Sequence, residues 1–179
     1  MAISTLAAAA GSNIDHWEQR IDLACAFRWT ARWNMHESVA NHFSIAVSDD
    51  GGHFLGNPRG RHCSRVRASD LILTDANDPS VMERPDAPDP SAWALHGGIH
   101  RRVPHARVIL HVHSKYATAL ACLKDPVLAP VDNNTMRFYE RIAYDLGFQG
   151  MGLGDEAERV AQGSQNGAQM DPKIGLNGS

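Results

Sequence analysis

The chain has 179 residues, of which 43% are hydrophobic, and a net charge of −3 with histidine neutral. This length suits one domain with a sizeable core, and the slight acidity disfavours nucleic acid or an acidic membrane surface as a partner, so we expect a small-molecule ligand. No run of 18 apolar residues is present, which predicts no membrane span. Three cysteines far apart in sequence predict reduced thiols in a cytoplasmic protein.

The first periodic segment begins near Asn13, a candidate helix N-cap. Apolar residues then recur at steps of three and four, which is typical of an amphipathic helix. They are Ile14, Trp17, Ile21, Ala24, Cys25, Trp29 and Trp33. Because burial is the commonest use of such a stripe, we expect its tryptophans to face the core.

Short alternating or branched apolar runs predict strands. The predicted strands are 41–47, 53–55, 71–74 and 108–114. Phe43, Ile45 and Val47 alternate on one face of the first run, which predicts a half-buried strand, and the glycine-containing turn at 48–52 predicts a hairpin with the second run.

The prolines between Asp75 and Pro90 predict an exposed loop inside the domain. Further helices are predicted at 92–102, 114–123, 133–144 and 155–162. Ser91 is the expected N-cap of the first of these, which should end before Pro104. Helices intermixed with short strands predict a layered α/β domain with a mixed sheet.

Two histidines, His111 and His113, close the apolar run that begins at Val108. Side chains two residues apart in a strand point to the same face, so both imidazoles should emerge on one side of the sheet. Neutral imidazoles suit a divalent transition metal such as zinc. The alternative is a pair of hydrogen-bonded histidines at a strand end, since a His-x-His pair is a short motif that also occurs by chance.

Four blocks, in this order, resemble the class II aldolase/adducin family over roughly residues 35–160. They are Asn57-Pro58-Arg59-Gly60, residues 69–75, residues 91–100 and the histidine strand. The resemblance implies a three-layer α/β/α sandwich with a central mixed, largely antiparallel sheet, and a homotetramer. It also implies a metal-dependent lyase that cleaves a C–C bond, by retro-aldol reaction or decarboxylation, in a small hydroxy-carbonyl or hydroxy-acid substrate.

The same resemblance implies Zn²⁺, or Mn²⁺, held by His111, His113 and a third histidine on a later strand. His113, however, is the last histidine in the sequence, so the ligand set is incomplete within this chain. The positions expected to surround the substrate's anionic end are Asn41, His42, Asn57, Arg59, Gly60 and Ser91.

Two departures from the family pattern bear on activity. Ala92 stands where the family's sugar-phosphate aldolases carry a glutamate acid/base, and His96, one helical turn later, is the nearest substitute; a hydrogen-bonded helix histidine is the alternative. Residues 163–179 show no apolar period, so we expect the domain at 1–162 and a flexible, divergent tail. These departures keep a second function open, a non-catalytic adducin-like interaction or assembly module.

Overall fold

The computed structural model describes residues 15–145 and 156–165. The predicted N-cap Asn13, the first stripe residue Ile14 and residues 166–179 of the predicted tail lie outside this range.

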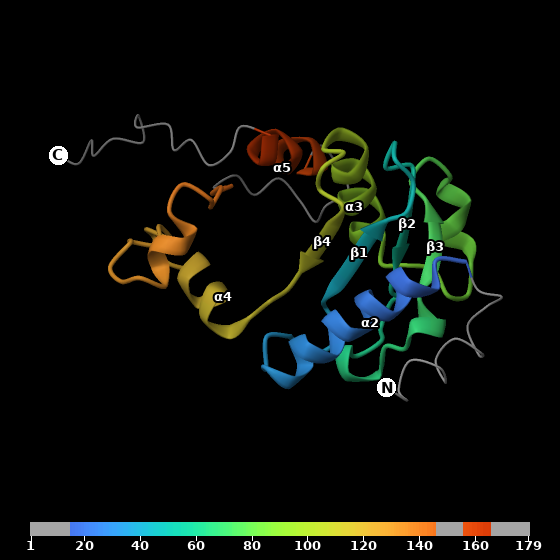
Figure 1. The fold of residues 1–179 in the computed structure, drawn as a ribbon, viewed down its shortest axis with the longest axis horizontal. Coiled ribbons are helices and arrows are strands. Elements are labelled where there is room, and N and C mark those ends of the chain that lie inside the picture. The colour runs from blue at the N-terminus through green and yellow to red at the C-terminus, as the bar shows by residue number, and fades with distance from the viewer. Residues whose placement is uncertain (1–14, 146–155, 166–179) are drawn as a thin grey trace, which may run out of the picture.

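Four strands form one sheet in the order β3-β2-β1-β4 (Figure 1). They are β1 (His42–Ala46), β2 (His53–Gly56), β3 (Ile72–Asp75) and β4 (Val108–His111). The predicted hairpin is confirmed, with Ser44 opposite Gly56. Every neighbouring pair is antiparallel, so in the part of the chain that the structure describes the sheet is antiparallel rather than mixed.

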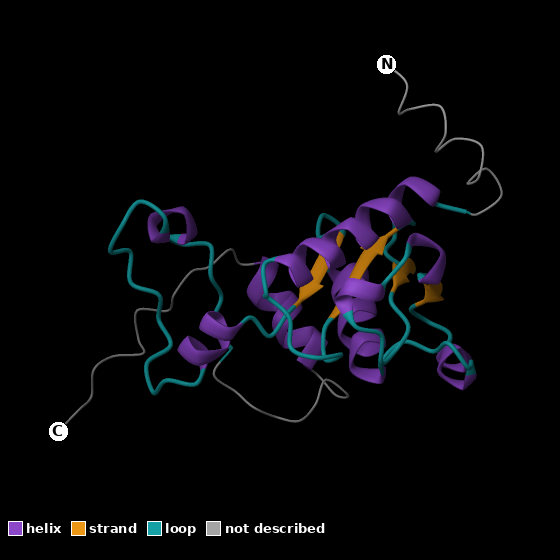
Figure 2. Ribbon diagram, turned by 90° about the horizontal axis from the view of Figure 1, so that it is seen from below, coloured by secondary structure: helices purple, strands orange, loops and turns teal. Residues whose placement is uncertain are grey.

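Helices cover both faces of this sheet (Figure 2). The helices are α2 (Trp17–Arg32), α3 (Pro90–Arg102), α4 (Lys115–Ala121) and α5 (Glu156–Gln165). On one face the ring of Phe27 in α2 stacks on Phe43 of β1, with ring centroids 4.2 Å apart. On the other face His100 of α3 reaches Ser44 of β1. The predicted α/β/α arrangement is confirmed.

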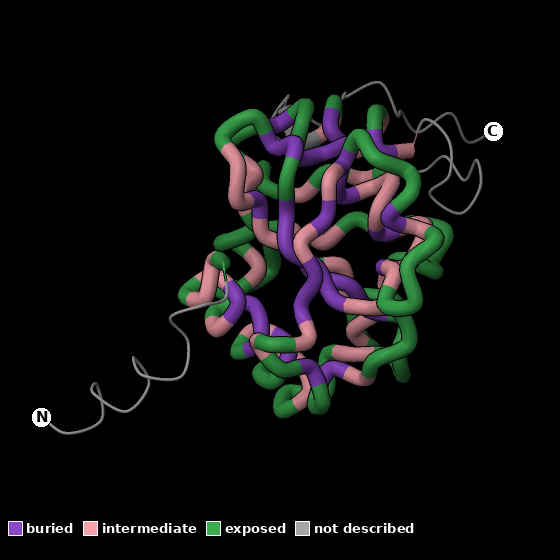
Figure 3. Tube along the Cα trace, turned by 90° about the vertical axis from the view of Figure 1, so that its right-hand side faces the viewer, coloured by how far each residue is buried: buried purple, intermediate pink, exposed green. Residues whose placement is uncertain are grey.

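Strand β1 is buried on both of its faces, so the prediction of a half-buried strand is wrong (Figure 3). Its α2 face belongs to an apolar core that contains Phe27, Phe43 and Leu55. Its α3 face carries the buried polar residues His42 and Ser44. Alternation in polarity along β1 therefore separates an apolar face from a polar one, and not the interior from solvent.

Helix α2 does not bury the tryptophan stripe that the sequence predicted. Leu23, Ala24 and Phe27 face the sheet, whereas Trp29 is 57% exposed and Trp33 is 68% exposed. Two sets of residues fit the helical period here, and the one that packs begins at Arg20, whose buried guanidinium donates to the carbonyl oxygen of Leu71. The larger side chains were the misleading signal.

Helix α3 begins two residues earlier than predicted, at Pro90, and its N-cap is Asp89 rather than Ser91. The Asp89 carboxylate accepts a hydrogen bond of 2.9 Å from the backbone N–H of Ser91, and proline suits the first helical position because its missing N–H needs no partner there. The preceding proline-rich stretch is mostly exposed, as its composition predicts, and it also contains the 3₁₀ turn Pro79–Glu83, which the sequence did not predict.

Two glycines permit close contacts around α3. Gly51, in the turn between β1 and β2, has φ +70°, and a Cβ atom there would overlap the backbone carbonyl of His100. A Cβ at Gly98 would overlap Ala157, so Gly98 lets α5 lie directly against α3. Both close contacts are possible only because glycine has no side chain.

Residues 115–145, which include α4, extend away from the sheet (Figure 1). The helix predicted at 133–144 is wrong, because only the 3₁₀ turn Thr135–Phe138 forms there. Met136, Phe138 and Tyr139 are exposed, so this segment lacks the packed apolar face from which most helices gain stability.

None of the described helices is long and apolar enough to cross a membrane.

Candidate functional site

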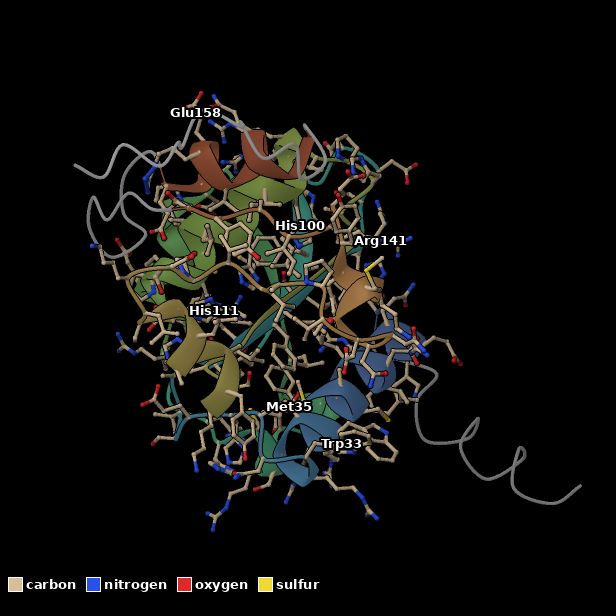
Figure 4. The ribbon with its side chains drawn as sticks, turned by 90° about the vertical axis from the view of Figure 1, so that its left-hand side faces the viewer. Trp33, Met35, His100, His111, Arg141 and Glu158 are labelled. Carbon is tan, nitrogen blue, oxygen red and sulfur yellow. The ribbon has the colours of Figure 1, made fainter. Side chains whose placement is uncertain are left out.

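His111 and His113 lie on the same side of the sheet, as their spacing predicts. Their Nε2 atoms are 2.8 Å apart. His111 is the last residue of β4, and His113 follows two residues later with its side chain 35% exposed. In the view of Figure 4, His111 lies between α4 and His100. The pair is therefore formed at the end of β4 and reachable from solvent.

Glu37 backs this pair from the loop between α2 and β1. Its Oε2 atom lies 2.7 Å from Nδ1 of His113, and the side-chain oxygen of Asn41 accepts a 3.2 Å hydrogen bond from the backbone N–H of His113. A carboxylate on one imidazole nitrogen fixes the ring and leaves the other nitrogen for a metal, as in the outer shell of many metal sites. Glu37 belongs to no sequence motif, and no local signal could have identified it.

The donor set fits part of a metal site. Two nitrogens bound to one tetrahedral zinc lie about 3.3 Å apart, given bond lengths of about 2.0–2.1 Å, which is close to the separation of the two Nε2 atoms. Among residues 15–145 and 156–165, no group of three or more His, Cys, Asp or Glu side chains is placed to hold a metal ion. Among the described residues, His111 and His113 are the candidate ligands, with Glu37 as a supporting carboxylate.

His42 lies directly opposite His111 in the β1–β4 pairing. The two rings are stacked, with centroids 4.2 Å apart and planes within 6° of parallel. Burial, followed by the neighbouring His111, lowers the pKa of His42 to about 4. His42 is thus a neutral imidazole beside the histidine pair at neutral pH.

His96 lies inside the protein, next to His42. It is buried, with Nε2 2.9 Å from Nδ1 of His42 and Nδ1 2.6 Å from the hydroxyl of Ser44. Burial holds the pKa of His96 well below its usual range. Both nitrogens of His96 are engaged in hydrogen bonds, which favours the alternative of a hydrogen-bonded helix histidine over the predicted acid/base role.

Two further polar residues, Ser44 and His100, join this interior. The Ser44 hydroxyl lies 2.8 Å from Nε2 of His100, and Nδ1 of His100 lies 2.9 Å from the carbonyl oxygen of Ala106. The available signal was the spacing of His96 and His100, four residues apart on one helical face.

The predicted residues Asn57 and Ser91 use their side chains inside the protein. The Asn57 amide accepts from the backbone N–H of Phe43 and donates to the carbonyl of Asn41, which fixes the start of β1. The Ser91 hydroxyl lies 2.6 Å from Oδ1 of Asp89 and donates to it. Both residues shape the site's surroundings through these bonds.

Arg59 and Gly60 line a separate groove of about 1420 Å³. Its arginines are Arg28, Arg59, Arg61, Arg65 and Arg67. Two carboxylates, Asp70 and Asp86, also line it, and Asp70 pairs with Arg61 at 2.7 Å. None of the four histidines 42, 96, 111 and 113 is among the described residues of this lining. Of the predicted substrate positions, the structure therefore places His42 beside His111, and Arg59 and Gly60 in this arginine-rich groove.

Comparisons with known proteins agree with this architecture. Residues 21–171 match the family model described as the Class II Aldolase and Adducin N-terminal domain. An aldolase II superfamily protein from Pseudomonas syringae is similar in structure, with a TM-score of 0.70 and 29% identity over 82% of this chain and 58% of that one. L-Fuculose 1-phosphate aldolase from Glaciozyma antarctica has a TM-score of 0.67 and 25% identity, covering 83% of this chain and 57% of that one.

A third relative belongs to a differently named group. Human beta-adducin is 28% identical over 144 residues, which cover 79% of this chain and 19% of that protein. The chain spans about half the length of the first curated relatives that it matches.

Proposed function

The chain belongs to the class II aldolase and adducin N-terminal domain family, and we propose that it acts as a metal-dependent lyase. The substrate class is a small hydroxy-carbonyl or hydroxy-acid compound, cleaved at a C–C bond by retro-aldol reaction or decarboxylation. The observation that carries this proposal is the convergence of His111 and His113, with Glu37 behind the second ring.

In this proposal His111 and His113 hold a divalent cation, Zn²⁺ or Mn²⁺, with further ligands from outside the described residues. Such a cation, when bound, polarises a substrate oxygen and stabilises the negative charge that C–C cleavage develops. Glu37 keeps the proton of His113 on Nδ1, so that Nε2 offers its lone pair on the side of His111.

The arginine-rich groove is proposed to hold the anionic end of the substrate. Five arginines face two carboxylates there, which leaves an excess of positive charge. Guanidinium groups match carboxylate and phosphate oxygens well. Arg59 lies on the turn that follows Asn57, whose side chain is fixed by its hydrogen bond to the backbone of Phe43.

Proton transfer is the weak part of this site. Ala92 has no titratable group, and both nitrogens of His96 are engaged. A general acid/base contributes about 10²- to 10⁴-fold to such reactions, so we expect turnover to be slow relative to family members that carry the glutamate.

Metal binding tests the proposal. Zinc titration of the purified chain, followed by calorimetry and metal analysis, should show stoichiometric binding that His111→Ala abolishes. His53→Ala is the matched control, because His53 is exposed on β2, which β1 separates from β4 in the same sheet, and should leave binding intact. Zinc binding that survives His111→Ala and His113→Ala would overturn the metal assignment.

A second function, a non-catalytic adducin-like interaction or assembly module, is favoured by Ala92 at the acid/base position and by the likeness to beta-adducin. An assay with small hydroxy-carbonyl and hydroxy-acid compounds separates the two. Chelator-sensitive turnover supports the lyase and excludes the module. The implied homotetramer and cytoplasmic location remain proposals of the same kind.

A further inference from the structure

A continuous chain of buried hydrogen bonds joins α3 to β1 and ends beside the histidine pair. The rings of His100, His96 and His42 and the hydroxyl of Ser44 are all buried. The successive contacts are His100 Nδ1 to Ala106 O at 2.9 Å, Ser44 Oγ to His100 Nε2 at 2.8 Å, His96 Nδ1 to Ser44 Oγ at 2.6 Å, and His42 Nδ1 to His96 Nε2 at 2.9 Å.

The donor and the acceptor of the first hydrogen bond, between His100 and Ala106, are fixed by chemistry. A backbone carbonyl can only accept, so Nδ1 of His100 must carry a proton and donate it to Ala106. Burial lowers the pKa of His100 to about 4, so the ring is neutral and its Nε2 is bare. That bare nitrogen accepts the hydroxyl proton of Ser44.

The remaining bonds follow from the first. Ser44 has a single proton and gives it to His100, so its oxygen accepts from His96, whose proton therefore lies on Nδ1. His96 is buried and neutral, which leaves its Nε2 bare. Only a proton on Nδ1 of His42 can complete the bond between these two rings.

We propose that the carbonyl of Ala106, acting through His100, Ser44 and His96, fixes His42 as the Nδ1–H tautomer and leaves its Nε2 as a hydrogen-bond acceptor beside His111. Ser44, His96 and His100 are positioning residues, since they act through His42. Along this series of hydrogen bonds, which we call the relay, the donor or acceptor role of each group is set by the group before it.

This assignment changes the ligand group expected at His42. A bare nitrogen accepts from a hydroxyl but cannot donate to a phosphate oxygen, and the Asp89 carboxylate that caps α3 adds negative charge on the same side of the sheet. Resting here on the proposed function, we assign His42 to a substrate hydroxyl and the anionic end to the arginine-rich groove.

Nitrogen-15 NMR of histidine-labelled, metal-free full chain at neutral pH reads the tautomer directly. His42, assigned by the loss of its signals in His42→Gln, should show a protonated, pyrrole-type Nδ1 and a bare, pyridine-type Nε2. A protonated Nε2 in the unmodified chain would overturn the proposal. The tautomer is read in the unmodified chain, and sequential assignment of its imidazole signals identifies His42 where the His42→Gln variant does not fold.

Substitution at Ser44 tests the relay. Ser44→Ala removes both the acceptor for His96 and the donor to His100, so His96 is free to move its proton to Nε2 and His42 should then show protonated Nε2. Thr74→Val is the matched control, because the Thr74 hydroxyl is buried in the same sheet and has no hydrogen-bond partner among the described residues. Ser44→Thr keeps the hydroxyl and should restore the original pattern. An unchanged His42 signal in folded Ser44→Ala would show that the relay does not set the tautomer.

Inorganic phosphate serves as the probe for the ligand assignment. We expect it to leave Nε2 of His42 bare, and protonation of that nitrogen on phosphate binding would overturn the assignment. Neither readout requires metal or turnover. If the unmodified chain does not bind zinc but His42 shows the Nδ1–H signal, the proposed lyase is rejected and the relay is retained.

Discussion

The two faces of strand β1 show how one short strand divides stability from chemistry. On the α2 side, Phe43 stacks on Phe27 in an apolar core. On the α3 side, Ser44 and His42 take part in a fully bonded polar chain. Apolar packing tolerates some change in shape, whereas a buried polar chain depends on every member, because one lost partner leaves its neighbours unsatisfied.

The largest expected effect comes from breaking the apolar face. Phe27→Ala should lower the free energy of unfolding by about 3–5 kcal/mol, because it leaves a cavity against Phe43. Urea unfolding measures this change. Trp33→Ala on the same helix is the control and should change stability by less than about 0.5 kcal/mol, since Trp33 is exposed. A small effect of Phe27→Ala would mean that α2 contributes little to the core.

The next largest effect is the pH dependence of the free energy of unfolding, which reports on the polar face of β1. The pKa of His100 falls to about 4 through burial, against an unfolded value of about 6.5, so between these values the unfolded chain binds more protons than the folded chain. The free energy of unfolding should therefore fall as pH drops below about 6.5, by about 1.4 kcal/mol per pH unit from this histidine alone, and level off below about 4.

His100→Gln isolates that contribution. Urea unfolding of metal-free protein between pH 7 and pH 5 should show a shallower dependence on pH in the variant, by roughly one proton. Equal slopes in the two proteins would contradict a neutral, buried His100.

The smallest expected effect is a change in zinc affinity that leaves the free energy of unfolding almost unaltered. Glu37→Gln removes the charge behind His113 and should weaken zinc binding by about 10- to 100-fold, while stability changes by less than about 0.5 kcal/mol. Calorimetric zinc titration and urea unfolding give the two values. Glu83→Gln is the control, because Glu83 is an exposed carboxylate in the proline-rich loop. Unaltered zinc affinity in Glu37→Gln would remove Glu37 from the site.

Local periodicity explains what the sequence predicts well. The hairpin from β1 to β2 follows from the glycine-containing turn between two apolar runs, and the common side of His111 and His113 follows from the two-residue period of a strand. The failures have a physical pattern as well. Trp29 and Trp33 fit a helical stripe, but the sheet contacts a neighbouring stripe, and tertiary packing decides between the two.

Long-range contacts account for the rest of the site. Ser44 and His100 are 56 residues apart in sequence, and Glu37 and His113 are 76 apart, so no window of local sequence contains both partners. The four-residue spacing of His96 and His100 indicates a shared helical face, but only the fold shows that this face meets β1.

The close approach at Gly51 has a consequence for how the histidines are held. Because the hairpin turn touches the backbone at His100, a bulkier residue at the buried position of Gly51 would push on the C-terminal part of α3, which carries the imidazoles of His96 and His100. The turn between β1 and β2 therefore limits how far this part of α3 can shift, and the alignment of the His100 ring limits which residues the turn tolerates.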